Sequence, residues 1–182
     1  MKQKINIVLT GAQSTGKTTL ANALAEKYNI TSLSICREQA NEQNWTPDTP
    51  GSVDYQKELF NKLQKSLSSK KSYISDRSLS CITAYTFKHA IENPNNKQLK
   101  KLAESQYKKF CDFHNKYENV LIVYTPIEFD IVDDGVRSTN ELEREYIDYL
   151  IKNILDTTGA YYIVVTGTVE QRLAQIEEEL NK

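Results

Sequence analysis

The sequence lacks the features that mark several large classes of protein. It has no apolar run of transmembrane length and no signal-peptide pattern at its start. Its three cysteines lie too far apart for a C-x-x-C pair, which indicates reduced thiols rather than a disulfide framework or a His/Cys metal site: Cys36, Cys81 and Cys111. With 23 basic and 24 acidic residues, the net charge of −1 favours neither nucleic acid nor a membrane surface as a partner. We therefore expect one domain spanning residues 1–182, located in the cytoplasm.

The sequence does contain a phosphate-binding motif close to its start. Residues 11–18 read G-A-Q-S-T-G-K-T and fit the pattern G-x-x-x-x-G-K-[ST]. The apolar residues 5–9 before the motif suit a buried strand, and the small and apolar residues over 19–28 suit an amphipathic helix. This context of strand, loop and helix predicts the binding of a nucleoside triphosphate.

Each residue type in the motif has a chemical reason. Glycines at 11 and 16 let the backbone wrap an anion, so that its N–H groups and the helix N-terminus face the phosphates. The Lys17 ammonium can reach the outer phosphates of ATP, and the Thr18 hydroxyl can hold Mg²⁺. The predicted ATP-binding residues of the loop are Gly11, Gln13, Ser14, Thr15, Gly16, Lys17, Thr18 and Thr19.

Five apolar runs separated by helical patterns predict an α/β fold. The expected strands are residues 5–9, 31–35, 72–75, 119–125 and 160–166. Alternation of strands and helices favours a five-stranded parallel sheet with helix layers on its faces, a three-layer P-loop architecture. Ligands of such sheets bind beyond the carboxyl ends of the strands, where the other candidate residues follow.

Two stretches after the second strand are candidates for substrate binding. Arg37 and Glu38 follow the strand directly. An arginine there can clamp an anion, and a glutamate can accept hydrogen bonds from hydroxyl groups, whereas a surface ion pair is the alternative. Trp45 lies in a turn-rich stretch and either anchors the core or offers a ring on which a base stacks.

The third strand ends at a second group of chemical residues, Asp76 and Arg77. A carboxylate beside the phosphate loop can hold the Mg²⁺ shell or take the proton of an attacking hydroxyl, and both roles remain open. Arg77 can neutralise phosphoryl oxygens as negative charge builds up on them. The alternative role of Asp76 is to cap a helix over residues 78–91.

A lid over the nucleotide is predicted at residues 128–145. Arg137 lies there between a glycine turn and a helix, from which it can close over ATP and exclude water. A plain junction of loop and helix is the alternative. Arg144 is the weaker lid candidate, because an arginine among glutamates on a helix is expected to form solvated ion pairs.

The last two helices carry recognisable end signals. Ser138 with Glu141 matches a capping box, so the first of these helices is expected to begin at Ser138 or the next residue and to end at Gly159. Thr168 with Gln171 predicts the start of the final helix in the same way.

The turn before the final helix is a candidate for contact with the adenine ring. Gly167 would allow a close approach of the base, and Arg172 either stacks near it or lies on the surface. Residues 115–118, N-K-Y-E, look like a guanine-reading N-K-x-D motif, but they end in glutamate and precede a strand, so we interpret them as a chance match.

Three landmarks in fixed order support a family resemblance. The phosphate loop, the R-E pair after the second strand and D-G-V-R-S at 134–138 resemble the ribosylnicotinamide kinase domain of bacterial NAD-regulator proteins and the small, AAA-like P-loop ATPases named after it. D-R-S-L-S at 76–80 is similar to the E-R-S-x-x-S motif of deoxynucleoside kinases. The resemblance implies a kinase-type strand order, with the strand of Asp76 beside that of the phosphate loop, and it implies that Arg137 matches the lid arginine.

The leading hypothesis is an ATP- and Mg²⁺-dependent kinase of a small nucleoside or nucleotide, with Lys17, Asp76, Arg77 and Arg137 as catalytic residues and Thr18 and Asp76 at the metal. The resemblance supplies the substrate class, either nicotinamide riboside-like or deoxynucleoside-like. A regulatory NTP-binding switch is the main alternative, and a nucleic-acid end kinase is disfavoured by the charge. No membrane partner is expected, and a homodimer is left open.

Overall fold

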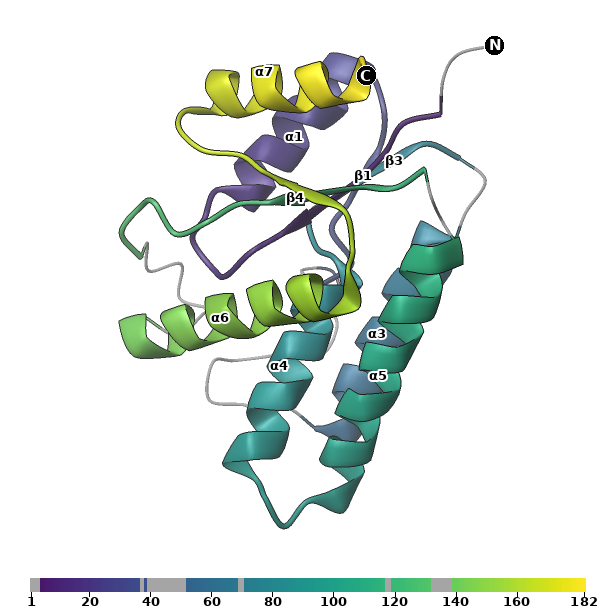
Figure 1. Cartoon of the computed structure of the whole chain (residues 1–182), viewed down its shortest axis with the longest axis vertical. Coiled ribbons are helices and arrows are strands. Elements are labelled where there is room, and N and C mark those ends of the chain that lie inside the picture. Colours follow the sequence, from purple (N-terminus) through teal and green to yellow (C-terminus); the bar gives the residue numbers. More distant parts are fainter. Residues whose placement is uncertain (1–3, 37, 39–51, 69–70, 117–118, 132–138) are drawn as a thin grey trace.

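A computed structural model describes residues 4–36, 38, 52–68, 71–116, 119–131 and 139–182. Its centre is a five-stranded, all-parallel sheet in the order β2-β3-β1-β4-β5 (Figure 1). The strands are β1 (Asn6–Thr10), β2 (Ser32–Leu33), β3 (Tyr73–Ser75), β4 (Leu121–Tyr124) and β5 (Tyr162–Val164). Each strand overlaps its predicted run, and β3 lies beside β1, so the predicted fold class and strand order are confirmed.

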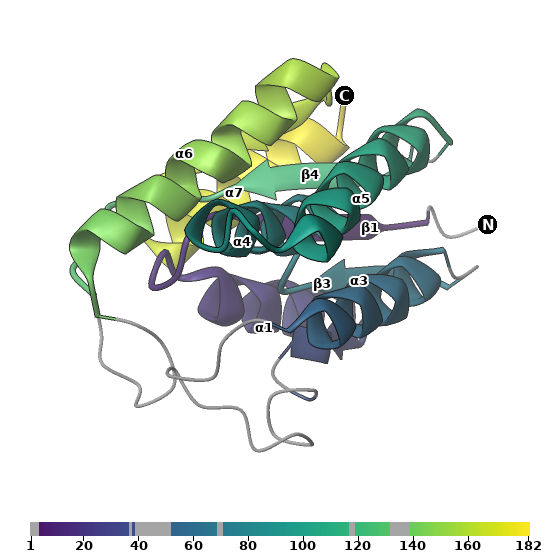
Figure 2. The same ribbon diagram turned by 90° about the horizontal axis from the view of Figure 1, so that it is seen from below.

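Helices cover both faces of the sheet. They are α1 (Lys17–Tyr28), α3 (Val53–Leu67), α4 (Leu79–Glu92), α5 (Lys97–Lys116), α6 (Glu141–Thr158) and α7 (Val169–Leu180). Figure 1 shows α1 and α7 on one face, and Figure 2 views the other face, which α3, α4, α5 and α6 cover. Within the described ranges, no helix combines the length and the apolar character needed to cross a bilayer.

The central strand β1 explains why two layers of helices are needed. Ile7 and Leu9 are fully buried in one core with Leu24 of α1 and Ile176 of α7. Val8 points the opposite way into the core formed by the other four helices. Side chains alternate between the two faces of a strand, so a strand with apolar side chains on both faces must be covered on both sides.

The helix ends follow local capping chemistry, with one correction. Gly159 ends α6 in a left-handed conformation (φ 64°), and Thr168 opens α7 with the predicted capping box. The predicted start of α6 is wrong: the helix begins at Glu141 because the Asn140 side chain accepts a hydrogen bond from the Glu143 N–H (3.3 Å). Ser138 lies outside the described residues.

Candidate functional site

The phosphate loop connects β1 to α1 through backbone conformations that explain its glycines. Gly11 (φ 144°) and Gly16 (φ 81°) have positive φ values, which glycine adopts readily because it has no Cβ. A Cβ at Gly11 would also lie 2.4 Å from the carbonyl oxygen of Thr125, just after β4. The loop is therefore packed tightly against the end of the neighbouring strand.

Lys17 and Thr15 form the interior of the loop. The Lys17 side chain is buried, and its ammonium donates to the Ala12 carbonyl and to Thr15 Oγ1. Thr15 Oγ1 lies 2.9 Å from Thr125 Oγ1, which ties the loop to the segment after β4. The loop thus holds a cation at its centre, as a site for a polyphosphate requires.

Asp76 lies beside the phosphate loop, where the strand order places it. Thr18 Oγ1 donates to Asp76 Oδ2 over 2.8 Å, although the residues are 58 positions apart. The second carboxylate oxygen, Oδ1, is buried and has no hydrogen-bond partner among the described residues. Buried polar atoms without partners are uncommon in folded proteins, so this oxygen is a candidate contact for a hydroxyl group or a metal-bound water.

The helix-cap alternative for Asp76 is wrong. Ser78 caps α4 instead, since its Oγ accepts a hydrogen bond from the Cys81 N–H over 3.2 Å. This leaves the Asp76 carboxylate available for the loop. Thr18 and Asp76 are the predicted metal residues, and no group of three or more His, Cys, Asp and Glu side chains in the described part of the chain could hold an ion. A Mg²⁺ ion here would therefore take Thr18, Asp76, phosphate oxygens and water as ligands, the set that Mg²⁺ commonly uses with nucleotides.

Arg77 lies next to Asp76 in a polar environment. Burial disfavours its charged form, but the negative potential of Tyr85, Cys81 and Asp76 leaves the pKa of the Arg77 guanidinium above its ordinary value. Its Nη1 is buried and has no hydrogen-bond partner in the described ranges. Nearby, Tyr85 donates to the Gln13 side chain of the loop over 3.0 Å. Two neighbouring residues after β3 thus each carry a buried polar atom without a hydrogen-bond partner among the described residues: an acceptor on Asp76 and a donor on Arg77.

Cys81 is a neighbour of the loop that the sequence did not single out. Its Sγ lies 3.2 Å from Thr10 Oγ1, and burial alone would raise its pKa. The charges of Arg77 and Lys17, together with hydrogen bonds to Ser78 and Thr10, outweigh this and lower the pKa of the thiol. No signal in the sequence marks Cys81, because only the packing of α4 places it beside the loop.

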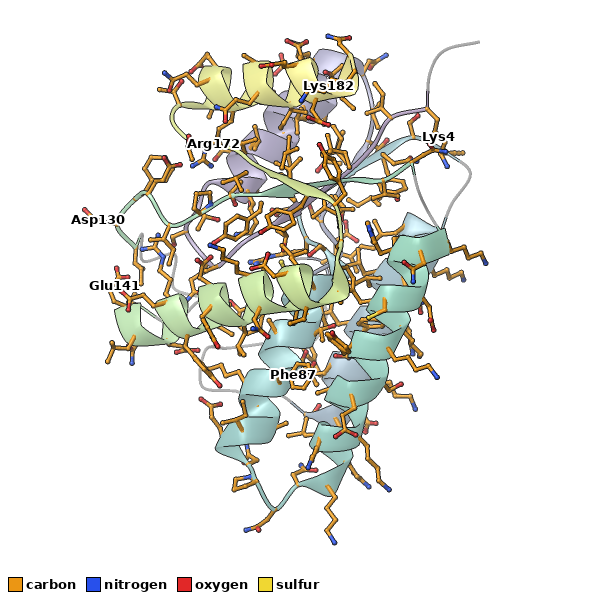
Figure 3. All side chains as sticks on the ribbon, viewed as in Figure 1. Lys4, Phe87, Asp130, Glu141, Arg172 and Lys182 are labelled. Carbon is orange, nitrogen blue, oxygen red and sulfur yellow. The ribbon has the colours of Figure 1, made fainter. Side chains whose placement is uncertain are left out.

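Two arginines, one expected in solvated ion pairs and the other with a surface position left open, are buried against the loop. Arg144 is 1% exposed and donates to the Ser14 carbonyl over 3.2 Å, so its predicted role in solvated ion pairs is wrong, although it does pair with Glu141 (3.3 Å). Arg172 is 2% exposed and donates to the Thr15 carbonyl over 2.7 Å, so its surface alternative is wrong. Figure 3 shows Arg172 and Glu141 on the same side of the molecule.

The segment after β4 links these arginines to the predicted base-binding turn. Glu128 accepts hydrogen bonds from the Gly167 N–H (3.1 Å) and from Arg172 Nη2 (2.5 Å). The Phe129 ring is 47% exposed and lies 5.1 Å from the Arg172 guanidinium. Gly167 is therefore close to the phosphate loop through Glu128 and Arg172, as a nucleotide-binding role requires.

The remaining predicted residues are less informative. Thr19 is exposed in the first turn of α1, and Glu38 is exposed after β2, where its N–H donates to the Ser34 carbonyl (3.0 Å). Arg37, Trp45 and Arg137 lie outside the described residues, as does the middle of the predicted lid, residues 132–138. Asn115 and Lys116 lie in the last turn of α5, just before β4. They are therefore near the amino ends of the strands, whereas the phosphate loop follows the carboxyl end of β1.

Known structures with the same fold include two kinases and a NadR protein. A NadR protein solved in complex with NR has a TM-score of 0.70 at 16% identity, covering 97% of this chain and 51% of that chain. Deoxyadenosine kinase from M. mycoides, with dCMP and dCDP bound, has a TM-score of 0.64 at 16% identity (97% and 98% covered). Thymidylate kinase from Candida albicans has a TM-score of 0.62 at 16% identity (98% and 92% covered). This chain thus spans about half the length of the NadR chains, and the likeness to all three shows a shared fold.

Comparison by sequence gives the family. No curated protein matches the chain. A family model described as an AAA domain matches residues 6–172, which include the phosphate loop, Asp76 and both buried arginines. The chain belongs to this family of P-loop AAA domains.

Proposed function

We propose that this protein is a kinase that transfers the γ-phosphoryl group of ATP, with Mg²⁺, to a hydroxyl group of a small nucleoside or nucleotide. The observation that carries the proposal is the pair formed by Thr18 and Asp76: one carboxylate oxygen is held at the phosphate loop and the other is buried without a partner among the described residues. A substrate hydroxyl that donates to Asp76 Oδ1 would lie next to the outer phosphates. The kinases that share the fold support the same reaction class.

Each residue then has a role in positioning or charge stabilisation, which dominates phosphoryl transfer. The loop N–H groups and Lys17 bind the triphosphate. Thr18 and Asp76 would hold Mg²⁺, which would supply positive charge to the phosphoryl oxygens. The unused Nη1 of Arg77 donates to the transferring group as negative charge develops. Arg137 closes over the nucleotide from the lid, and Gly167 lies beside the base.

Asp76 has two roles that exclude each other at a given oxygen. As a general base, Oδ1 accepts the proton of the attacking hydroxyl. In the metal shell, the same carboxylate would help to hold Mg²⁺ and would not take the proton of the attacking hydroxyl. Arg37, Glu38 and Trp45 are the proposed contacts for the acceptor, because they come after β2 in the sequence and ligands of parallel sheets bind beyond the carboxyl ends of the strands.

The test is ATP consumption against a panel of nucleosides, deoxynucleosides, nicotinamide riboside and nucleoside monophosphates, with the product identified by mass. We expect one class of acceptor to gain 80 Da and Lys17→Ala to abolish the gain. Lys27→Ala is the matched control, because Lys27 lies at the far end of α1 in a half-exposed pair with Glu177. ATP hydrolysis that continues unchanged across the whole panel, with no phosphorylated acceptor, would favour a regulatory switch and contradict the kinase.

A further inference from the structure

The phosphate loop is held from behind by two buried cations from different helices. Arg144 of α6 donates to the Ser14 carbonyl, and Arg172 of α7 donates to the carbonyl of the next residue, Thr15. We propose that these arginines are positioning residues: each fixes one peptide plane of the loop so that the following N–H group faces the phosphates of the nucleotide. The inference deepens the proposed function, on which it rests for the identity of the ligand.

The link between a carbonyl and the next N–H group is geometric. A trans peptide unit is planar, and its C=O and N–H bonds point in opposite directions. A carbonyl turned outward to a guanidinium therefore turns the N–H of the following residue to the inner side of the loop. Arg144 sets the N–H of Thr15 in this way, and Arg172 sets the N–H of Gly16. Lys17 contacts Ala12 and Thr15 from within the loop, on the side where the phosphates would lie.

The backbone of the loop needs such support. Ser14 has a positive φ of 56°, which is unfavourable for a residue with a Cβ, and the bond from Arg144 compensates it. The Thr15–Gly16 peptide plane is weakly fixed by its own residues, because glycine adopts positive and negative φ values about equally well. Without Arg172, this plane could turn its carbonyl oxygen toward the phosphates, where it would repel them.

Both guanidinium groups are fixed by further contacts. Arg172 donates its other terminal nitrogen to Glu128 (2.5 Å), and Arg144 donates to the Phe129 carbonyl (2.5 Å). The planar fork of an arginine holds two acceptors in one geometry, which a lysine does not. Both side chains are almost fully buried, so their bonds to the carbonyls are shielded from competition with water. The segment Glu128–Phe129 is thereby the common support of both arginines.

A role in positioning predicts an effect on anion binding that does not depend on the base or on the acceptor. Arg172→Gln and Arg144→Gln are each expected to weaken the binding of Mg·ATP and of inorganic tripolyphosphate by the same factor, about 10- to 100-fold, the loss of one charge-assisted hydrogen bond. Calorimetry on the full chain, below the unfolding temperature of each variant, measures both dissociation constants. Ile176→Val is the matched control, because it removes one buried methylene group from α7 without touching the loop.

Amide NMR separates positioning from general stability. In ¹⁵N-labelled protein, Arg172→Gln should shift the Gly16 amide resonance most strongly and Arg144→Gln the Thr15 resonance, whereas Ile176→Val should move neither. Arg172→Lys should recover part of the affinity, because an ammonium donates to the Thr15 carbonyl with less fixed geometry. If Arg172→Gln does not fold, Arg172→Lys provides the test. Its affinity for tripolyphosphate should then be lower than that of the wild type, by less than the loss of about 10- to 100-fold expected for a lost bond.

The outcomes also separate this inference from the proposed function. Folded variants that bind tripolyphosphate as tightly as the wild type would overturn the positioning role, whatever their stability. A wild-type protein that binds tripolyphosphate and phosphorylates no acceptor would overturn the kinase, while the variants would still support or refute the role of the arginines. A wild-type protein that binds no triphosphate would overturn both.

Discussion

Replacement of Gly11 by alanine tests how tightly the phosphate loop is built into the sheet. The new Cβ would lie 2.4 Å from the Thr125 carbonyl oxygen and 2.8 Å from Thr125 Oγ1, both far inside contact distance. Overpacking of a dense interior costs about 1–3 kcal/mol, and the φ of +144° adds a strain of about 1–3 kcal/mol. We expect Gly11→Ala to lower the free energy of unfolding by about 2–6 kcal/mol, a large part of the 5–15 kcal/mol typical of a folded protein.

The matched control is Gly159→Ala at the end of α6. Gly159 also has a positive φ (+64°), but a Cβ there would meet no atom within 4 Å, so only the backbone strain of about 1–2 kcal/mol remains. Urea unfolding followed by circular dichroism measures both variants. A loss for Gly11→Ala no larger than that for Gly159→Ala would refute the steric argument.

Three further predictions concern phosphoryl transfer. Lys17→Ala should abolish turnover, because it removes the cation at the centre of the loop; a steady-state assay with measurable product would contradict this. Asp76→Asn, which still accepts from Thr18 but takes no proton, should lower kcat about 10²- to 10⁴-fold if Asp76 is the base, and a kcat within about threefold of wild type would exclude that role. Arg137→Ala should lower kcat more than ATP affinity, as calorimetry and kinetics together show; equal losses would count against the lid.

The sequence predicted those parts of the site that depend on local chemistry. The loop motif needs glycines at Gly11 and Gly16 for its backbone, and the apolar run before it needs covering on both faces, so the motif and the parallel sheet were predictable together. The position of Asp76 followed from its place at the end of a strand once β3 was expected beside β1.

The sequence did not predict the two arginines behind the loop. An arginine among glutamates on an amphipathic helix is expected to face solvent. Nothing in the spacing of residues around Arg144 indicates which loop the helix contacts. Arg172 lies in the first turn of α7, where only the packing of that helix against α1 turns it toward Thr15. Such contacts join residues 130 and 157 positions apart, so they depend on the tertiary fold and leave no local pattern.

The outermost strands of the sheet limit how this protein can assemble. β2 has two residues and β5 has three, too few to act as a template on which another chain could add a strand. Extension of the sheet from one copy to the next is therefore disfavoured, and the chain is protected from that route to fibrous aggregation. If two copies pair, we expect them to meet without strand addition, and cross-links between copies should not map to β2 or β5.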